Sequence, residues 1–219
     1  MAKRFAVTAL IYGLTQVSGM YTLYEYAPSG NSYKLRLAMT QLGLPFKRIN
    51  LDITQGESRT PEFLEINANG RVPVLVLENG ERLSESNAIL WYLADGTPLL
   101  PTSKLEQAQV LQWMFFEQYS HEPFIATARY WVYSLGAEDE YKSKLDENRP
   151  KGYAALDVME KHLTSNEFFV GNTYSIADIA LYAYTHVAEQ GGYSLAAYPA
   201  IQAWFKRVEA MDNYIPITQ

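Results

Sequence analysis

The sequence predicts a small α/β domain followed by an all-helical domain, and three patterns lead to this fold class. Between residues 20 and 97, stretches rich in β-forming residues alternate with amphipathic stretches in the order β-α-β-α-β-β-α. Beyond residue 97 no strand pattern follows, and apolar residues recur at helical spacing in four segments. Pro98 and Pro101 mark a linker between the two parts. We therefore expect domains at residues 20–97 and 103–219.

Local signals set the elements of the first domain. Gly43 ends the first helix, and Thr60 before Pro61 is an N-cap followed by proline at the first helical position. Asn79-Gly80 is a hairpin turn. The expected elements are a strand at 20–26, a helix through 35–42, a strand at 46–53, a short helix to about 67, strands at 74–78 and 81–83, and a helix at 85–95.

The second domain opens with a long, aromatic-rich helix over residues 105–135, which we expect to bend at Pro123. Apolar residues at helical spacing predict three further helices, centred on residues 156–163, 176–187 and 201–208. Ser175 and Asp178 form a Ser-x-x-Asp capping box at the start of the second of these. We interpret this pair as structural, because no histidine lies at a spacing that suggests a catalytic partner.

Composition excludes several classes of function. Eighteen basic against 24 acidic residues give a net charge of −6, which argues against a nucleic-acid partner. The absence of cysteine rules out disulfides, a cysteine nucleophile and thiolate metal sites. Only three histidines are present, and none have helical metal-ligand spacing, so we expect no protein-held metal.

Residues 1–19 differ from the rest of the chain. Lys3 and Arg4 precede an apolar run, which loosely imitates a secretory signal but is too short to span a bilayer, and we expect no membrane partner. The alternating pattern of strands and helices begins directly at Met20. We therefore favour an over-called start with Met20 as the initiator, and expect the extension to be mobile or removed.

Four motifs occur in order along the chain. The first, SGNSYKLRL (29–37), places hydroxyls where a strand turns into a helix, and the second, NGRVPVL (69–75), places Val-Pro before a strand. The third, ESNAILWYL (85–93), places an acid and a hydroxyl at a helix start, and the fourth, SIADIAL (175–181), contains the capping box. Together they resemble the cytosolic glutathione transferase family, in a bacterial branch similar to the serine-type theta and delta classes. The resemblance implies a thioredoxin-like N-terminal domain, a helical C-terminal domain, glutathione as co-substrate, a homodimer and a cytoplasmic location.

The turn at residues 29–32 is the candidate thiol site. Ser29 precedes a helix, whose free N–H groups and dipole stabilise an anion. Lowering a thiol pKa of about 8.5 by two units needs roughly 2.7 kcal/mol, which one hydroxyl donor and the helix end could supply. Taken alone, the segment favours a simple helix cap. The resemblance favours catalysis by Ser29, with Asn31 and Ser32 as competitors and Tyr26 as a further candidate.

The resemblance also implies which residues hold glutathione. Val72-Pro73 matches the position of a cis-proline that leaves the Val72 backbone free to pair with an extended peptide. Glu85 and Ser86 would bind the ammonium and carboxylate of the γ-glutamyl group, and Arg71 the glycyl carboxylate. The alternatives are a strand start for Pro73, helix capping for Glu85 and Ser86, and a solvated Arg71.

We expect an enzyme that ionises the glutathione thiol and adds it to an electrophilic carbon or displaces a halide. The alternatives are glutathione-dependent reduction of a peroxide or disulfide, and a non-catalytic binding module of the same fold. Most aromatic residues of the long helix should serve the core or a dimer contact, and a few should line an apolar pocket for the electrophile. His121 is similar in position to a histidine near the active site of the beta class, but a structural role is commoner for such a residue.

Overall fold

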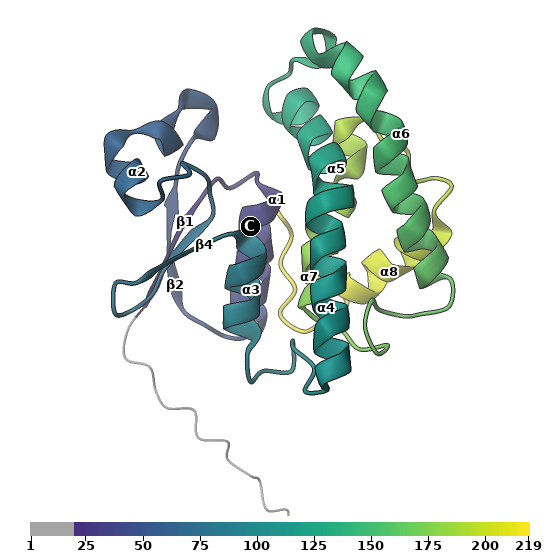
Figure 1. The fold of residues 1–219 in the computed structure, drawn as a ribbon, viewed down its shortest axis with the longest axis horizontal. Helices are drawn as coiled ribbons and strands as arrows, with labels where there is room; N and C mark the ends of the chain where they lie inside the picture. The colour runs from purple at the N-terminus through teal and green to yellow at the C-terminus, as the bar shows by residue number, and fades with distance from the viewer. Residues whose placement is uncertain (1–19) are drawn as a thin grey trace, which may run out of the picture.

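The computed structural model describes residues 20–219, so our expectation for residues 1–19 lies outside the described residues. A sheet with flanking helices stands beside a bundle of longer helices (Figure 1). This arrangement confirms the predicted fold class, a thioredoxin-like domain followed by a helical domain. No helix within residues 20–219 has both the length and the apolar character needed to cross a membrane.

The first domain is built on a mixed four-stranded sheet in the order β2-β1-β3-β4, in which only β1 and β2 are parallel. The strands are β1 (Tyr21–Glu25), β2 (Phe46–Asn50), β3 (Val74–Val76) and β4 (Arg82–Ser84). The helices are α1 (Gly30–Gln41), α2 (Pro61–Ile66) and α3 (Ser86–Ala94). Helices α1 and α3 cover the face of the sheet that looks toward the helical domain, and α2 lies on the other side (Figure 1).

Two strands end two or three residues earlier than predicted. The second ends at Asn50 instead of residue 53, because Asp52 caps a 3₁₀ turn at Ile53–Gln55 by accepting from the Thr54 backbone N–H at 2.9 Å. The third ends at Val76 instead of residue 78, where the Asn79-Gly80 turn begins to form. Thr60 caps α2 as expected, accepting from the Phe63 N–H at 3.3 Å.

The helical domain contains five α-helices within the described residues. They are α4 (Lys104–Phe116), α5 (Glu122–Arg129), α6 (Glu138–Leu163), α7 (Ile176–Thr185) and α8 (Pro199–Glu209). The single helix predicted over 105–135 is instead α4 and α5, each followed by a π-helical turn, at Glu117–His121 and Tyr130–Ser134. The first π turn ends two residues before Pro123, where we expected a bend. Helix α6 is much longer than its apolar segment predicted, since its first half is largely exposed.

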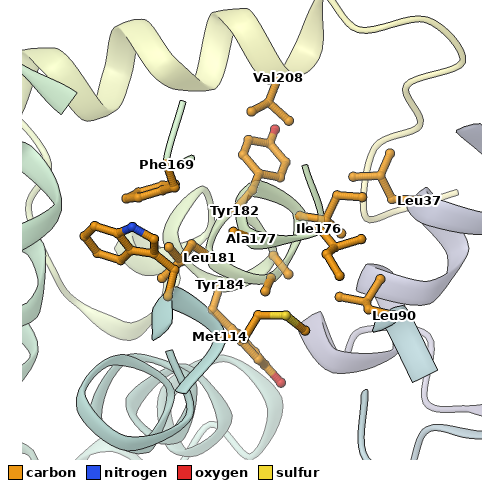
Figure 2. Packing of buried hydrophobic residues seen from close by; sticks show 14 of the residues in the cluster. Leu37, Leu90, Met114, Phe169, Ile176, Ala177, Leu181, Tyr182, Tyr184 and Val208 are labelled. Carbon is orange, nitrogen blue, oxygen red and sulfur yellow. The ribbon is translucent and has the colours of Figure 1, made fainter. Parts of the chain in front are cut away.

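Helix α7 is the centre of the core. All ten of its residues are buried. Side chains from both domains converge on it, including Leu37 of α1, Leu90 of α3 and Met114 of α4 (Figure 2). The capping box at its start is confirmed: Asp178 accepts from the Ser175 backbone N–H at 3.0 Å, and Ser175 accepts from the Ala177 N–H. The carboxylate of Asp178 also accepts from Trp204 at 3.0 Å, which supports our structural interpretation.

The C-terminal segment returns to the first domain and lies along α1 (Figure 1). The Tyr33 hydroxyl donates to the Ile215 carbonyl at 2.7 Å, and Arg36 donates to the Ile217 carbonyl at 2.7 Å. Arg36 also forms a buried ion pair with Glu25 of β1. The last residues of the described chain therefore complete hydrogen bonds of its first helix.

Candidate active site

A cavity of about 490 Å³ lies between the two domains, at the start of α1. Its volume is typical of small-molecule sites. Residues 26–86 form one side, here called the sheet wall. The other side, the helical wall, includes Gln118, Glu122, Thr127, Arg129, Tyr130 and Tyr184.

The sheet wall brings together all but one of the predicted site residues. They are Ser29, Asn31, Arg71, Val72, Pro73, Glu85 and Ser86. The structure does not bring Ser32 to the cavity. Its side chain is fully buried, and its Oγ accepts from the Tyr26 backbone N–H at 3.3 Å. Tyr26, the further candidate, does line the cavity.

Ser29 is the N-cap of α1 and faces the cavity at the same time. Its Oγ accepts from the Ser32 N–H at 3.4 Å, and its backbone is extended, with φ −70° and ψ 128°. Capping uses an acceptor lone pair, so the hydroxyl proton stays available as a donor. The capping role and the catalytic role that we weighed against each other are therefore compatible.

The residue directly after Ser29, Gly30, must be glycine. A Cβ on Gly30 would lie 2.7 Å from the ring of Tyr184, so only glycine lets α1 start this close to the helical wall. Tyr184 lines the cavity, and burial raises the pKa of its hydroxyl. Tyr184 is consequently protonated at neutral pH, and it supports the candidate thiol site from the opposite wall.

Asn31 connects the two walls. Its Nδ2 donates to Glu122 on α5 at 2.8 Å, and its Oδ1 accepts from the Ser86 hydroxyl at 3.1 Å. These two bonds fix the orientation of the amide. One Nδ2 hydrogen remains for a ligand.

The start of α3 has an unusual backbone. Glu85 has φ 68° and ψ 109°, a conformation that non-glycine residues rarely adopt, and its side chain makes no capping hydrogen bond. The Ser86 hydroxyl is used by Asn31 and by Lys34, whose Nζ donates to it at 3.3 Å. Glu85 occupies the N-cap position of α3, but neither side chain makes the capping hydrogen bond that we considered as the alternative. Backbone strain of this kind concentrates at functional sites.

A loop before β3 completes the sheet wall. The Val72–Pro73 peptide bond is cis, and within residues 20–219 the Val72 N–H and C=O form no hydrogen bond. Arg59 donates to the Asn69 carbonyl at 2.8 Å, and Asn67 donates to the Arg71 carbonyl at 2.8 Å, so the loop is held from both sides. The resulting backbone edge can accept an extended peptide.

Buried polar groups join the walls behind the cavity. Lys34 of α1 pairs with Glu117 at 3.0 Å, with neither side chain exposed. Asn87 of α3 accepts from Lys34 at 3.3 Å and donates to Glu117 at 3.0 Å. Burial raises the pKa of Glu122, which lies close to this pair. We call Asn31, Lys34, Asn87, Glu117 and Glu122 the polar seam; only Asn31 among them was singled out from the sequence.

The aromatic residues of the long helical segment do not form the apolar pocket that we expected. Trp113 lies in the core, while Phe115 and Tyr119 are 68% and 83% exposed. Tyr130 alone among the candidates lines the cavity, beside largely polar neighbours. The residues that we considered were Trp113, Phe115, Phe116, Tyr119, His121, Phe124, Tyr130 and Trp131.

His121 is a buried structural residue. Its Nε2 lies 2.8 Å from Thr185 Oγ1, whose single hydrogen is donated to the Leu181 carbonyl at 2.6 Å, so Nε2 is the donor. Burial, together with the charge of Lys34, lowers the pKa of His121 to about 3. It does not line the cavity.

The structure combines a thioredoxin-like domain that carries a cis-proline loop, a helical domain, and a polar cavity at the start of α1. Two protein-family models match the chain, one in each domain. The model described as "Glutathione S-transferase, N-terminal domain" matches residues 28–95, and "Glutathione S-transferase, C-terminal domain" matches residues 113–212. The chain belongs to the glutathione transferase family.

Of two curated relatives, only one has a name that states an activity. The disulfide-bond oxidoreductase YfcG of Escherichia coli is 31% identical over 87% of this chain and 91% of its own length. Protein URE2 of Eremothecium gossypii is 30% identical over 86% of this chain. The chain spans 64% of the length of that URE2 protein.

Solved structures show the same fold. A glutathione S-transferase from Pseudomonas fluorescens Pf-5 is 50% identical, with a TM-score of 0.89 over 91% of this chain and 100% of that one. Ure2p in complex with glutathione is 26% identical, with a TM-score of 0.81 over 89% of this chain and 96% of that one.

Proposed function

We propose that the protein binds glutathione in the cavity, stabilises its thiolate at the start of α1, and uses that thiolate as a nucleophile toward a small electrophile. The observation that carries the proposal is the exposure of a hydroxyl donor, Ser29, to the cavity at a helix N-terminus. A thiolate there is stabilised by the helix dipole and by the Ser29 hydroxyl. Through this serine we also propose a likeness to the theta and delta classes.

The peptide would lie along the sheet wall. We propose that its cysteinyl backbone pairs with Val72 and that its γ-glutamyl group reaches the start of α3 at Glu85 and Ser86. Arg71 would take the glycyl carboxylate. The unpaired Val72 backbone and the uncapped start of α3 support this placement.

The Ser29→Ala variant tests the thiolate mechanism. We expect the pKa of the bound glutathione thiol to rise by about one to two units, and turnover at neutral pH to fall, while glutathione affinity changes little. Thiolate absorbance measured against pH gives the result. Ser32→Ala is the matched control, because its hydroxyl is buried away from the cavity.

Parallel variants of Asn31 and Tyr26 complete the test. If Ser29→Ala leaves the titration unchanged and Asn31→Ala or Tyr26→Phe shifts it, the role belongs to that residue. Unchanged titrations in all of these variants would contradict a side-chain donor and leave the backbone N–H groups of α1.

Disulfide reduction is the second candidate, and the polar helical wall favours it over an apolar electrophile. Here the thiolate attacks one sulfur of a disulfide, forms a mixed disulfide and releases a thiolate. A second glutathione thiolate then attacks the mixed disulfide, which gives glutathione disulfide and a second released thiol. The protein needs no cysteine, because the electrons come from two glutathione molecules.

Two substrates separate these reactions. Turnover of a neutral aryl halide with loss of halide supports conjugation, and turnover of bis(2-hydroxyethyl) disulfide with formation of glutathione disulfide supports reduction. Glutathione binding without either activity would favour a non-catalytic binding module. A Saccharomyces cerevisiae relative is named "Transcriptional regulator URE2", a name that fits such a module.

We also propose a homodimer and a cytoplasmic location, where the reduced glutathione pool is found. Leu111, Phe115 and Tyr119 follow one another at four-residue spacing and form an exposed apolar stripe on α4 and the turn after it. Such a stripe suits a two-fold contact. The proposed domain limits remain 20–97 and 103–219, and the two family-model matches fall within them.

A further inference from the structure

Arg129 at the end of α5 is a buried cation without a carboxylate partner. Its side chain is 4% exposed. The other two buried cations of the described chain are paired, Lys34 with Glu117 and Arg36 with Glu25, whereas no ion pair within residues 20–219 includes Arg129. Buried charges are normally paired, because an unpaired one is costly to desolvate.

Two of its nitrogens are used by neutral groups that fix the guanidinium in place. Nε donates to Gln190 at 2.8 Å, and Nη1 donates to the Pro28 carbonyl at 2.6 Å. The group also lies over the Tyr133 ring, at 4.8 Å from its centroid. Its orientation is therefore set before any ligand arrives.

The third nitrogen is free to bind a ligand. Within residues 20–219, Nη2 has no hydrogen-bond partner, and it is not among the polar atoms that are both buried and unpaired. Since Arg129 lines the cavity, its accessible part faces the cavity. Nη1 of the same guanidinium donates to the Pro28 carbonyl, and Pro28 directly precedes Ser29, so the guanidinium lies next to the proposed thiol site.

The surroundings suit an anion with hydrogen-bonding oxygens. Three hydroxyl-bearing residues close to Arg129 in the sequence, Thr127, Tyr130 and Ser134, line the same cavity, as does Tyr26 from the sheet wall. The acidic residue of the helical wall, Glu122, is already bound by Asn31 and Gln118.

We propose that Arg129 forms a carboxylate-binding subsite for the second substrate, so that the electrophile or disulfide attacked by glutathione carries a carboxylate close to its reacting atom. This inference rests on the proposed function and specifies its substrate class. An arginine can hold a carboxylate through charge-assisted hydrogen bonds, which discriminate strongly against an uncharged analogue.

Two product analogues of nearly equal shape test the subsite. S-(2-carboxyethyl)glutathione carries the carboxylate, and S-(2-carbamoylethyl)glutathione carries a neutral amide in its place. Calorimetry should show the wild type binding the carboxylate analogue about tenfold more tightly. In Arg129→Gln, which keeps hydrogen-bond donors but loses the charge, this ratio should fall to about one, while the affinity for plain glutathione stays within about threefold.

Arg149→Gln is the matched control. Arg149 also donates to backbone carbonyls, those of Gly191 and Gly192, and lies over the ring of Tyr193, but it does not line the cavity. Its variant should keep the wild-type ratio.

The outcomes distinguish a failure of the carboxylate-binding subsite from a failure of the proposed function. Equal binding of the two analogues by the wild type would overturn the subsite even if the variant failed to fold, and would leave the proposed function standing. A preference that persists in Arg129→Gln would also overturn it. Failure of the wild type to bind plain glutathione would overturn the proposed function and the subsite together.

Discussion

The two walls of the cavity are built from different kinds of groups. The sheet wall offers backbone features: a helix start at Ser29, a cis peptide at Pro73 and a strained residue at Glu85. The helical wall offers side chains, among them Thr127, Arg129 and others along α5 and the turn after it. Backbone features constrain which ligand fits, whereas side chains on a helix face are replaced without altering the fold. The sheet wall is therefore suited to a constant ligand and the helical wall to a variable one.

The polar seam prevents the two walls from acting independently. Asn31 contacts Ser86 on one side and Glu122 on the other, and Lys34 contacts Glu117. A change in one wall can thus reach the other through these groups. The following experiments separate local effects in each wall from effects on the seam.

Removing the Lys34–Glu117 ion pair of the polar seam should have the largest effect, which is on the free energy of unfolding. We expect Lys34→Met to lower the free energy of unfolding by about 3–5 kcal/mol, because it leaves the Glu117 carboxylate buried without its cation. Urea denaturation measures this change. The double variant Lys34→Met/Glu117→Leu should recover most of the loss, and no recovery would contradict a simple charge-pairing role.

The surface pair Lys142–Asp146 is a useful reference for that experiment. Both side chains are largely exposed, so Lys142→Met should leave the unfolding midpoint nearly unchanged.

The outer face of the helical domain should matter for assembly and not for the cavity. A charge introduced by Phe115→Glu should raise the dissociation constant of the proposed dimer at least about 100-fold, because an unpaired carboxylate would be buried in an apolar contact. Sedimentation measures the dissociation constant. Phe115→Tyr is the conservative control, and a wild type that is monomeric at micromolar concentration would refute the dimer.

Within the sheet wall, Ser86→Ala should weaken glutathione binding about tenfold, since one hydrogen bond to a charged carboxylate is lost. Calorimetry gives the affinity, and a thermal melt shows whether the seam has also weakened through Lys34. Ser84→Ala, two residues earlier and outside the cavity, should leave both unchanged. An unaltered affinity in Ser86→Ala would show that the γ-glutamyl group binds elsewhere.

The effect of His121 on the free energy of unfolding should be the smallest of these effects, and it should appear only at acidic pH. Its pKa is lowered to about 3 in the folded protein by burial, with a contribution from Lys34, while an unfolded histidine has a pKa of about 6.5. Below pH 6.5 the unfolded chain takes up a proton that the folded protein does not, so stability falls as the pH falls. The loss should be about 1.2 kcal/mol at pH 5.5 relative to pH 7.

Two variants check the assignment to this histidine. Unfolding free energies measured from pH 8 to pH 5 should depend less on pH in His121→Gln. Thr185→Val loses the same hydrogen bond but keeps the imidazole, so it should retain the wild-type pH dependence.

The sheet wall was largely predictable because its features are local in the sequence. A serine at a strand-to-helix junction, Val72-Pro73 before a strand and Glu85-Ser86 at a helix start are each recognised within a few residues, and all line the cavity. The choice among Ser29, Asn31 and Ser32 was not predictable, because it depends on which way each side chain leaves the first turn of α1. The structure turns Ser32 inward.

The helical wall could not be predicted, for a physical reason that lies in the two π turns flanking α5. Each π turn, at Glu117–His121 and Tyr130–Ser134, closes its hydrogen bonds over five residues instead of four and so shifts the helix face by one residue. A regular period of 3.6 residues therefore fails to assign Glu122 and Arg129 to the cavity. Tyr184 presents a second difficulty, since it lies far along the chain in a helix that is buried throughout.

The return of the C-terminal segment to α1 has a consequence for synthesis on the ribosome. The carbonyls that accept from Arg36 and Tyr33 belong to residues 181 and 182 positions later in the chain. At about 5–20 residues per second, the first helix emerges roughly 10–40 s before these partners are made. During that interval both donors lack these two carbonyl partners, so these two hydrogen bonds to α1 form late in synthesis.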